Sequence, residues 1–370
     1  MFEVIHEDGS SGARVGLLKT KHGEVKTPAF MPVATKGGVK TLDPQEVVEV
    51  GTQAIISNAF LLYLKPGVDV IREAGGLHEF SGFSDTVIFT DSGGFQMLRE
   101  SFFEGVSKKG VTFRSPFDDS KHVFTPEKCM EVQMALGSDV AMVLDDCPPY
   151  DANYDRVKKS TERTVEWAKR CIDAHGGDQF LFCIIQGGHF KDLRRDNTEA
   201  LGGLGFDGYG IGGLSIGEPL DEMFDTLRYS VPLIPRDKPR YLMGVGSPVE
   251  LLESVGLGVD IFDSAFPTRN ARHNTVYTYG GKYNISKGRF KGDYGPLEEG
   301  CGCYACQNFS RAYVSHLMRV HEALGMRLVT IHNLYFIHDL LEKAREAMVK
   351  DGLEEFKLEF ERDYSKRADL

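Results

Sequence analysis

Eight short apolar runs, separated for the most part by amphipathic helical stretches, constrain the fold of this chain more than any other feature. They are rich in β-branched and aromatic residues and begin at Pro28, Ala54, Val87, Val140, Leu181, Tyr209, Arg240 and Val259. Continuous apolar runs of this kind are typical of parallel strands buried on both faces. Eight such strands alternating with helices predict an α/β fold, a (β/α)8 barrel. The alternative is an open doubly wound sheet, but in this sequence no G-x-G-x-x-G motif follows the first strand.

Three segments interrupt this alternation. Each reads as a β-hairpin, because two apolar or alternating runs flank a short turn-forming segment. The predicted hairpins cover residues 13–28, 110–126 and 274–286. A cysteine-rich segment and two long helical stretches follow the last of them.

Composition places the chain among globular proteins. With 370 residues, 41% of them hydrophobic and 26% charged, it is long enough for one large domain or two medium ones. No apolar run approaches the roughly 20 residues of a membrane span, and the first residues lack the pattern of a signal peptide. Seven cysteines, most of them scattered, favour a reducing cytoplasm over a disulfide framework.

A basic segment stands out against the net charge of −11. Between Arg269 and Lys291 the charged residues are all basic, with no Asp or Glu: Arg269, Arg272, Lys282, Lys287, Arg289 and Lys291. A local basic patch attracts a polyanion to one face of an acidic protein. The alternative is a solvated hairpin that binds nothing.

The stretch "CGCYACQNF" holds three of the seven cysteines, Cys301, Cys303 and Cys306. Three thiolates this close in sequence suit a zinc ion, which takes four protein ligands in a structural site. The other cysteines lie far back in the chain, so the residues nearby leave the fourth ligand open. A small buried or reactive thiol cluster is the alternative.

Polar residues gather where the predicted strands end. In a (β/α)8 enzyme these ends form the catalytic face. They carry Asp91, Asp145, Asp146, Gln186, Gly212, Gly213, Met243 and Asp263. Taken singly, an Asp here is usually a helix cap and a Gly a turn residue. Together they offer a carboxylate nucleophile, a second carboxyl for proton transfer and a polar edge for a planar heterocycle.

Several long motifs resemble one known family over nearly the whole chain. They are "TDSGGFQ", "GIGGLSIGE", "RYLMGVG", "FDSAFPTRNARH" and "CGCYACQNFSRAY", and they resemble the tRNA-guanine transglycosylases of the bacterial type. The resemblance implies an irregular (β/α)8 barrel with a C-terminal zinc-binding subdomain inserted before the last helix. We divide the chain into a catalytic barrel (1–272), a zinc subdomain with the basic hairpin (273–332) and a C-terminal helix that packs back on the barrel (333–370). The motif "TIHNL" supplies His332 as the fourth ligand of one structural zinc ion per chain.

The family exchanges the wobble guanine of queuosine-family tRNAs (Asp, Asn, His and Tyr) for a 7-deazaguanine. By resemblance, Asp263 is the nucleophile that forms a covalent aspartyl-ribose intermediate, and Asp91 is the general acid and base. The base would be read and stacked by Asp145, Gln186, Gly213, Leu214, Phe95 and Met243. The anticodon loop would be gripped by Arg269, Arg272, Lys287 and Arg289. The resemblance also implies a homodimer.

Three residues depart from the family pattern. Phe95, Asp146 and Leu61 stand where many relatives carry Tyr, Glu and His. Two other readings share the fold: a non-catalytic tRNA-binding partner, against which the presence of both Asp91 and Asp263 argues, and a DNA-modifying relative. For the entering base we expect 7-aminomethyl-7-deazaguanine rather than queuine, because Ile216 stands where the queuine-using relatives open the site with a glycine.

Overall fold

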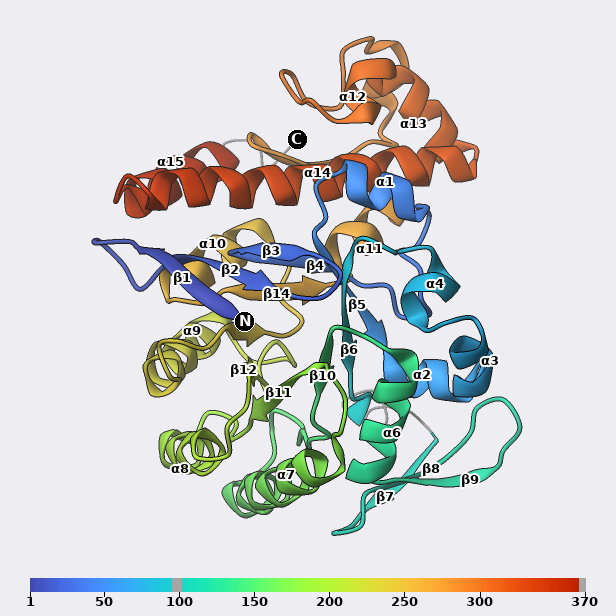
Figure 1. Ribbon diagram of the computed structural model, residues 1–370. Helices are drawn as coiled ribbons and strands as arrows, with labels where there is room; N and C mark the ends of the chain where they lie inside the picture. Colours follow the sequence, from blue (N-terminus) through green and yellow to red (C-terminus); the bar gives the residue numbers. More distant parts are fainter. Residues whose placement is uncertain (95–101, 366–370) are drawn as a thin grey trace.

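The computed structural model describes residues 1–94 and 102–365, and Figure 1 shows its arrangement. Eight parallel strands form one sheet in the order β4-β14-β13-β12-β11-β10-β6-β5. Their bounds are β4 Ala29–Pro32, β5 Ala54–Asn58, β6 Val87–Asp91, β10 Val140–Met142, β11 Phe180–Ile185, β12 Gly208–Ile211, β13 Arg240–Leu242 and β14 Ile261–Ser264. Every one of the eight apolar runs is therefore a strand of this sheet.

The sheet closes on itself between its first two strands in chain order. Val33, just after β4, forms a parallel bridge with Ile56 of β5, and the N–H of Ala34 donates to the carbonyl of Ile56 at 2.8 Å. This bridge joins the two end strands of the sheet at one point and nearly closes the barrel. The predicted irregular (β/α)8 barrel is thus confirmed.

Helices surround the barrel. Their bounds are α1 Pro44–Glu49, α2 Ala59–Leu64, α3 Val68–Glu73, α4 Leu77–Ser81, α6 Pro126–Leu136, α7 Tyr154–Ala174, α8 Lys191–Gly202, α9 Leu220–Ser230, α10 Pro248–Gly256 and α11 Phe266–Arg272, with a 3-10 turn η1 at Val231–Leu233. Local chemistry fixes their ends. In α6, Thr125 caps the first turn through the N–H of Lys128, Pro126 takes the first position, and Gly137 ends the helix in the left-handed conformation.

Aromatic side chains fill the barrel interior. Phe89 of β6 packs edge-to-face on Phe182 of β11 and on Tyr241 of β13, with ring centroids 5.7 and 6.1 Å apart. All three side chains are buried. The interior is therefore a packed core, and reactive groups are confined to its open end.

Two of the predicted hairpins gain a third strand. The N-terminal sheet consists of β1 Phe2–Glu7, β2 Arg14–Lys19 and β3 Glu24–Thr27, and the inserted sheet of β7 Phe103–Val106, β8 Val111–Arg114 and β9 Lys121–Phe124. The alternating burial of β1 marks it as an edge strand with one solvated face.

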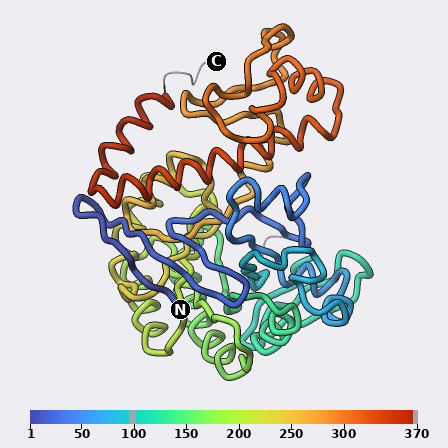
Figure 2. The backbone as a smooth tube through the Cα atoms, turned by 45° about the horizontal axis from the view of Figure 1, so that its top comes forward, coloured from blue at the N-terminus to red at the C-terminus, as the bar shows by residue number. Residues whose placement is uncertain are grey.

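The C-terminal part comprises β15 Thr275–Thr278, β16 Gly281–Asn284, the 3-10 turn η2 Gly288–Gly292, α12 Tyr304–Asn308, α13 Arg311–Arg319, α14 Ala323–Met348 and α15 Leu353–Ser365. The third predicted hairpin is thus present as β15–β16. Helix α14 packs against α11, β4 and β15, and Figure 2 shows it running along the barrel beneath the protruding orange segment. The division at residues 272 and 332 stays a prediction, and α14 crosses the second of these boundaries without a break. The described residues after His332 form the rest of α14 and the helix α15. Within residues 1–94 and 102–365, no helix is both long and apolar enough to cross a membrane.

Candidate active site and metal centre

A cavity of about 530 Å³ opens at the carboxyl ends of the strands. Of the residues predicted to act on the base, those that line it are Asp91, Asp145, Gln186, Gly213, Leu214, Met243 and Asp263, joined by Arg269 at its edge. The closed barrel brings these residues together from six strands that are far apart in sequence. Phe95, predicted to stack on the base, lies outside the described residues.

Asp263, at the end of β14, is held by two donors. The hydroxyl of Tyr241 donates to its Oδ1 at 2.6 Å, and the N–H of Gly244 donates to the same oxygen at 3.1 Å. Neither bond uses Oδ2. Burial raises the pKa of Asp263, and the Tyr241 and Gly244 bonds oppose that rise because they favour the carboxylate.

Asp91, at the end of β6, lies in the electrostatic field of Asp263. Burial, and then the charge of Asp263, raise the pKa of Asp91 to about 7, against a hydrogen bond from Asn58 that lowers it. The Asn58 amide donates to Oδ2 of Asp91 at 3.1 Å. A carboxyl group with a pKa near neutrality can both give and take a proton at physiological pH.

Asp145 and Gln186 form one polar edge of the cavity. The Gln186 amide donates to Oδ2 of Asp145 at 2.7 Å. Burial raises the pKa of Asp145 to about 6, and the Gln186 bond opposes this. Gly212 and Gly213 bring the main chain of the next strand against Gln186, because a Cβ on either would lie 2.7–2.8 Å from the Gln186 amide.

The segment after Gly213 is fixed by a carboxylate. Ser215 adopts a left-handed conformation with φ of 57°, which costs free energy for a residue other than glycine. Glu218 accepts hydrogen bonds from the N–H groups of Ser215 and Ile216. Ile216 lines the main cavity.

Two of the residues that depart from the family pattern, Asp146 and Leu61, are neighbours of cavity residues. Asp146 is fully buried and pairs with Arg156 at 2.7 Å and with Arg163. Leu61 lies on α2, where its N–H donates to Asn58 at 2.7 Å. Neither is itself among the described residues that line the cavity.

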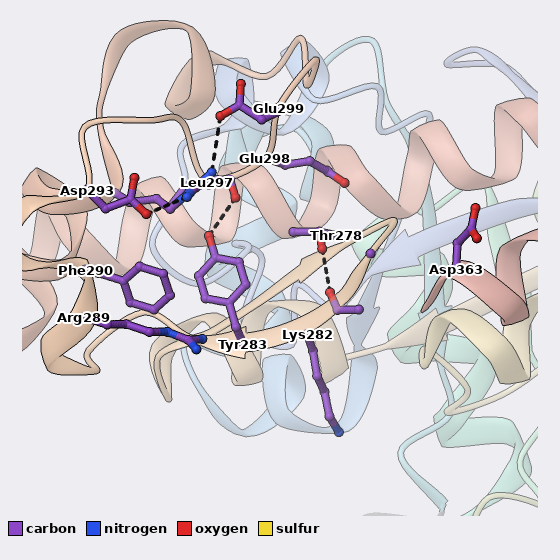
Figure 3. Close-up of a pocket in the computed structure, with 13 residues that line it drawn as sticks. Thr278, Lys282, Tyr283, Arg289, Phe290, Asp293, Leu297, Glu298, Glu299 and Asp363 are labelled. Carbon is purple, nitrogen blue, oxygen red and sulfur yellow. Dashed lines mark hydrogen bonds and ion pairs between the residues drawn. The ribbon is translucent and has the colours of Figure 1, made fainter. Parts of the chain in front are cut away.

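Three of the predicted RNA-binding residues lie outside the cavity. Arg272 donates to the carbonyl of Thr268 at 2.9 Å within α11. Lys287 and Arg289 are exposed at the turn η2. Arg289 also lines a second cavity of about 590 Å³, in which Figure 3 shows Arg289 and Lys282 below Tyr283, with Glu298 and Glu299 above it.

Cys301, Cys303, Cys306 and His332 converge in a buried cluster whose ligand atoms all lie within 4.8 Å of one another. The three sulfur atoms lie 3.6, 3.5 and 3.4 Å from Nδ1 of His332. Tetrahedral zinc, with Zn–S near 2.3 Å and Zn–N near 2.1 Å, separates sulfur and nitrogen by about 3.6 Å. Nε2 of His332 lies 2.7 Å from the carbonyl of Tyr277, which leaves Nδ1 for the metal. The donor set and its spacing fit a closed zinc site.

Sequence reasoning missed Asn58, Tyr241 and two residues of α8, Arg194 and Asn197. Asn58 ends a strand at the same end of the barrel as the predicted aspartates, so its position in the sequence could have identified it as a cavity residue. Tyr241 is two residues before Met243, and the period of a strand would have placed both side chains on one face. Arg194 and Asn197 lie on a helix, where nothing in the sequence indicates that they are buried.

The pKa of Asp91 predicts how stability depends on pH. Between pH 3.8 and about 7 the unfolded chain has lost the Asp91 proton while the folded chain keeps it. Folding therefore binds a proton in this window, and this contribution to stability is lost as the pH rises through about 7. Asp91→Asn removes the titration, so relative to wild type the variant should gain stability with rising pH, by at most about 1.4 kcal/mol per pH unit. Urea unfolding of both proteins at pH 4.5, 6 and 8 measures the difference in their free energies of unfolding. A difference that stays constant with pH would contradict the prediction.

The match to known proteins covers almost the whole chain. The family model for queuine tRNA-ribosyltransferase matches residues 8–366. The queuine tRNA-ribosyltransferase of Halothermothrix orenii is 49% identical over 370 residues, covering 100% of this chain and 99% of the relative. Those of Pelotomaculum thermopropionicum and Bacillus subtilis are 52% and 48% identical, covering 98% and 97% of this chain and 98% and 94% of the relatives. This chain is therefore a pentosyltransferase that belongs to the queuine tRNA-ribosyltransferase family.

Proposed function

We propose that this protein is a tRNA-guanine transglycosylase of queuosine biosynthesis, which exchanges the wobble guanine of the tRNAs for Asp, Asn, His and Tyr for 7-aminomethyl-7-deazaguanine. The observation that carries the proposal is the pair of carboxyl groups at one cavity, Asp91 with a pKa near 7 and Asp263 held by Tyr241. A non-catalytic partner has no need of two such groups. The cytoplasmic location expected from the sequence and the homodimer that the family resemblance implies belong to the same proposal.

In the first half of the reaction, Oδ2 of Asp263 attacks C1′ of the ribose. The C1′–N9 bond breaks, its electron pair stays on guanine, and Asp91 supplies the proton that neutralises the departing base. The Tyr241 and Gly244 donors hold Oδ1 and so orient the attacking oxygen. The product is a ribosyl ester of Asp263.

In the second half, the entering 7-deazaguanine gives its pyrrole proton to Asp91. Its nitrogen attacks C1′, the ester bond breaks, and its electron pair returns to Asp263. Asp145, Gln186 and the main chain at Gly213 and Leu214 would read the edge of the base, which Phe95 and Met243 would stack. Incubation with labelled guanine and bulk tRNA, followed by mapping of the label, tests the reaction. No label at the wobble position would contradict it.

Ile216 supports the aminomethyl base over queuine. Its branched side chain lines the cavity beside Leu214, where the cyclopentenediol of queuine would need room. The Leu214 carbonyl could accept from the ammonium group of the smaller base, since the Glu218 carboxylate already accepts from the main chain. We expect a higher kcat/KM for the aminomethyl base in direct competition, and a shift toward queuine in Ile216→Gly. A preference of the wild type for queuine would overturn the argument.

We further propose that the segment from Arg269 to Lys291 contacts tRNA phosphates. Lys287 and Arg289 are exposed, and contacts to phosphates position an RNA without reading its sequence. In the double variant Lys287→Ala and Arg289→Ala, the KM for tRNA should rise roughly tenfold at physiological salt, with kcat unchanged. RNA affinity of the wild type should fall as salt rises. As a control, Lys191→Ala on α8 should leave the KM for tRNA unchanged. If the KM for tRNA is also unchanged in the double variant, the segment from Arg269 to Lys291 does not contribute to tRNA binding.

A further inference from the structure

Arg194 on helix α8 is a fully buried cation. Its guanidinium donates to main-chain carbonyls and, among the described residues, to no carboxylate: Nε donates to Gly188 at 2.6 Å and Nη2 to Gly212 at 3.0 Å. Within the described part of the chain, Nη1 has no hydrogen-bond partner. Burying a charge without an adjacent counter-charge costs free energy. A contribution to stability alone therefore does not explain why an arginine stands at this position.

The two carbonyls belong to neighbouring loops of the cavity. Gly188 follows β11 and Gly212 follows β12, and these strands pair in parallel up to Ile185 and Ile211. A planar guanidinium with fixed donors can span two strand ends, which a single ammonium group cannot. The approach is close, because a Cβ on Gly187 would lie 2.7 Å from both Cγ and the main-chain nitrogen of Arg194.

The bond to Gly212 determines which way the next N–H points. In a trans peptide the C=O and N–H groups point in opposite directions. With the Gly212 carbonyl on Arg194, the N–H of Gly213 is directed to the other side of the chain. Gly213 lines the cavity and has a φ of 70°, so Arg194 determines the direction of a donor at the base site.

The same helix also holds Gln186. One turn along α8, the Oδ1 of Asn197 accepts from the N–H of Gln186 at 2.9 Å, and Asn197 is buried. Gln186 in turn reaches Asp145. One face of α8 therefore supports both the side-chain and the main-chain groups of the base-reading edge.

We propose that Arg194 is a positioning and specificity-determining residue, which fixes the Gly212–Gly213 peptide so that its N–H selects a purine with a 6-oxo group. The proposal rests on the proposed base exchange. Burial lowers the pKa of Arg194 to about 10, an effect that Cys147 and Glu218 oppose, so the guanidinium stays charged at neutral pH. A cation behind the peptide polarises the N–H toward an acceptor on the base.

The test compares binding of guanine with binding of 2-aminopurine, which lacks the 6-oxo acceptor, by equilibrium dialysis without tRNA. In Arg194→Met, guanine should bind roughly tenfold more weakly while 2-aminopurine changes less than twofold. Arg194→Lys keeps the positive charge but loses the planar guanidinium with its fixed donors, so its affinity for guanine should lie between those of wild type and Arg194→Met. In steady-state exchange the KM for guanine should rise and the KM for tRNA should stay.

Arg195→Met is the matched control, because Arg195 lies next on α8, half-exposed, and pairs with Asp196 at 3.1 Å. It should retain the wild-type preference for guanine. If Arg194→Met or Arg194→Lys keeps the full preference for guanine, the proposal fails. It also fails if both bases weaken together in proportion to a lowered Tm, since that is the signature of a structural role. Wild-type protein that binds guanine but exchanges none would instead contradict the proposed function.

Discussion

Asp263→Asn should abolish base exchange. The amide cannot act as the nucleophile, so turnover should fall by at least about 10³-fold. When wild-type protein is mixed with tRNA and denatured, an RNA–protein adduct should remain, and in Asp263→Asn it should be absent. Gel electrophoresis under denaturing conditions and exchange of labelled guanine measure the two effects.

Two further variants separate the roles at this site. Tyr241→Phe removes one donor to Asp263 but leaves the carboxylate, so it should slow turnover and still form the adduct. Asp91→Asn removes the proton carrier, so turnover should fall roughly 10²- to 10⁴-fold. An adduct that persists in Asp263→Asn and disappears in Asp91→Asn would reverse the two assignments.

Loss of the zinc ligands should have the second large effect. Cys303→Ser should reduce the zinc content from one equivalent per chain to nearly none and unfold the segment around β15, β16 and α12. In structural zinc sites metal binding supplies on the order of 10 kcal/mol of folding free energy. Helix α14 should stay in place, because it also packs on α11 and β4. Elemental analysis and limited proteolysis measure the two outcomes.

The matched control is Cys171→Ala. Cys171 is equally buried but lies on α7, where its thiol makes a weak hydrogen bond of 3.8 Å to the carbonyl of Pro126. This variant should keep one zinc ion and the proteolysis pattern of the wild type. Active wild-type enzyme that contains no zinc would contradict the assignment of Cys301, Cys303, Cys306 and His332.

The eight strands, and the three aspartates and Gln186 of the cavity, could be predicted from the amino-acid sequence. Strands buried on both faces must be apolar throughout, so each run from Pro28 to Val259 was visible without tertiary information. The ends of parallel strands share one face, so Asp91, Asp145, Gln186 and Asp263 could be grouped before any distance was known. The three clustered cysteines indicated a metal by their spacing, whereas His332 came from the resemblance.

The neighbours that give these groups their chemistry are visible in the folded molecule and not in the sequence. Burial and the charge of Asp263 together raise the pKa of Asp91, and local sequence encodes neither the burial of a side chain nor the proximity of these two aspartates. Asp146 adjoins Asp145, yet it turns to Arg156 and Arg163. Arg194 is one arginine among several on polar helices, and the packing of α8 against β11 places its guanidinium within hydrogen-bond distance of the Gly212 carbonyl. Propensity and periodicity act over a few residues, whereas desolvation and hydrogen bonding depend on residues that the closed sheet brings together from distant parts of the chain.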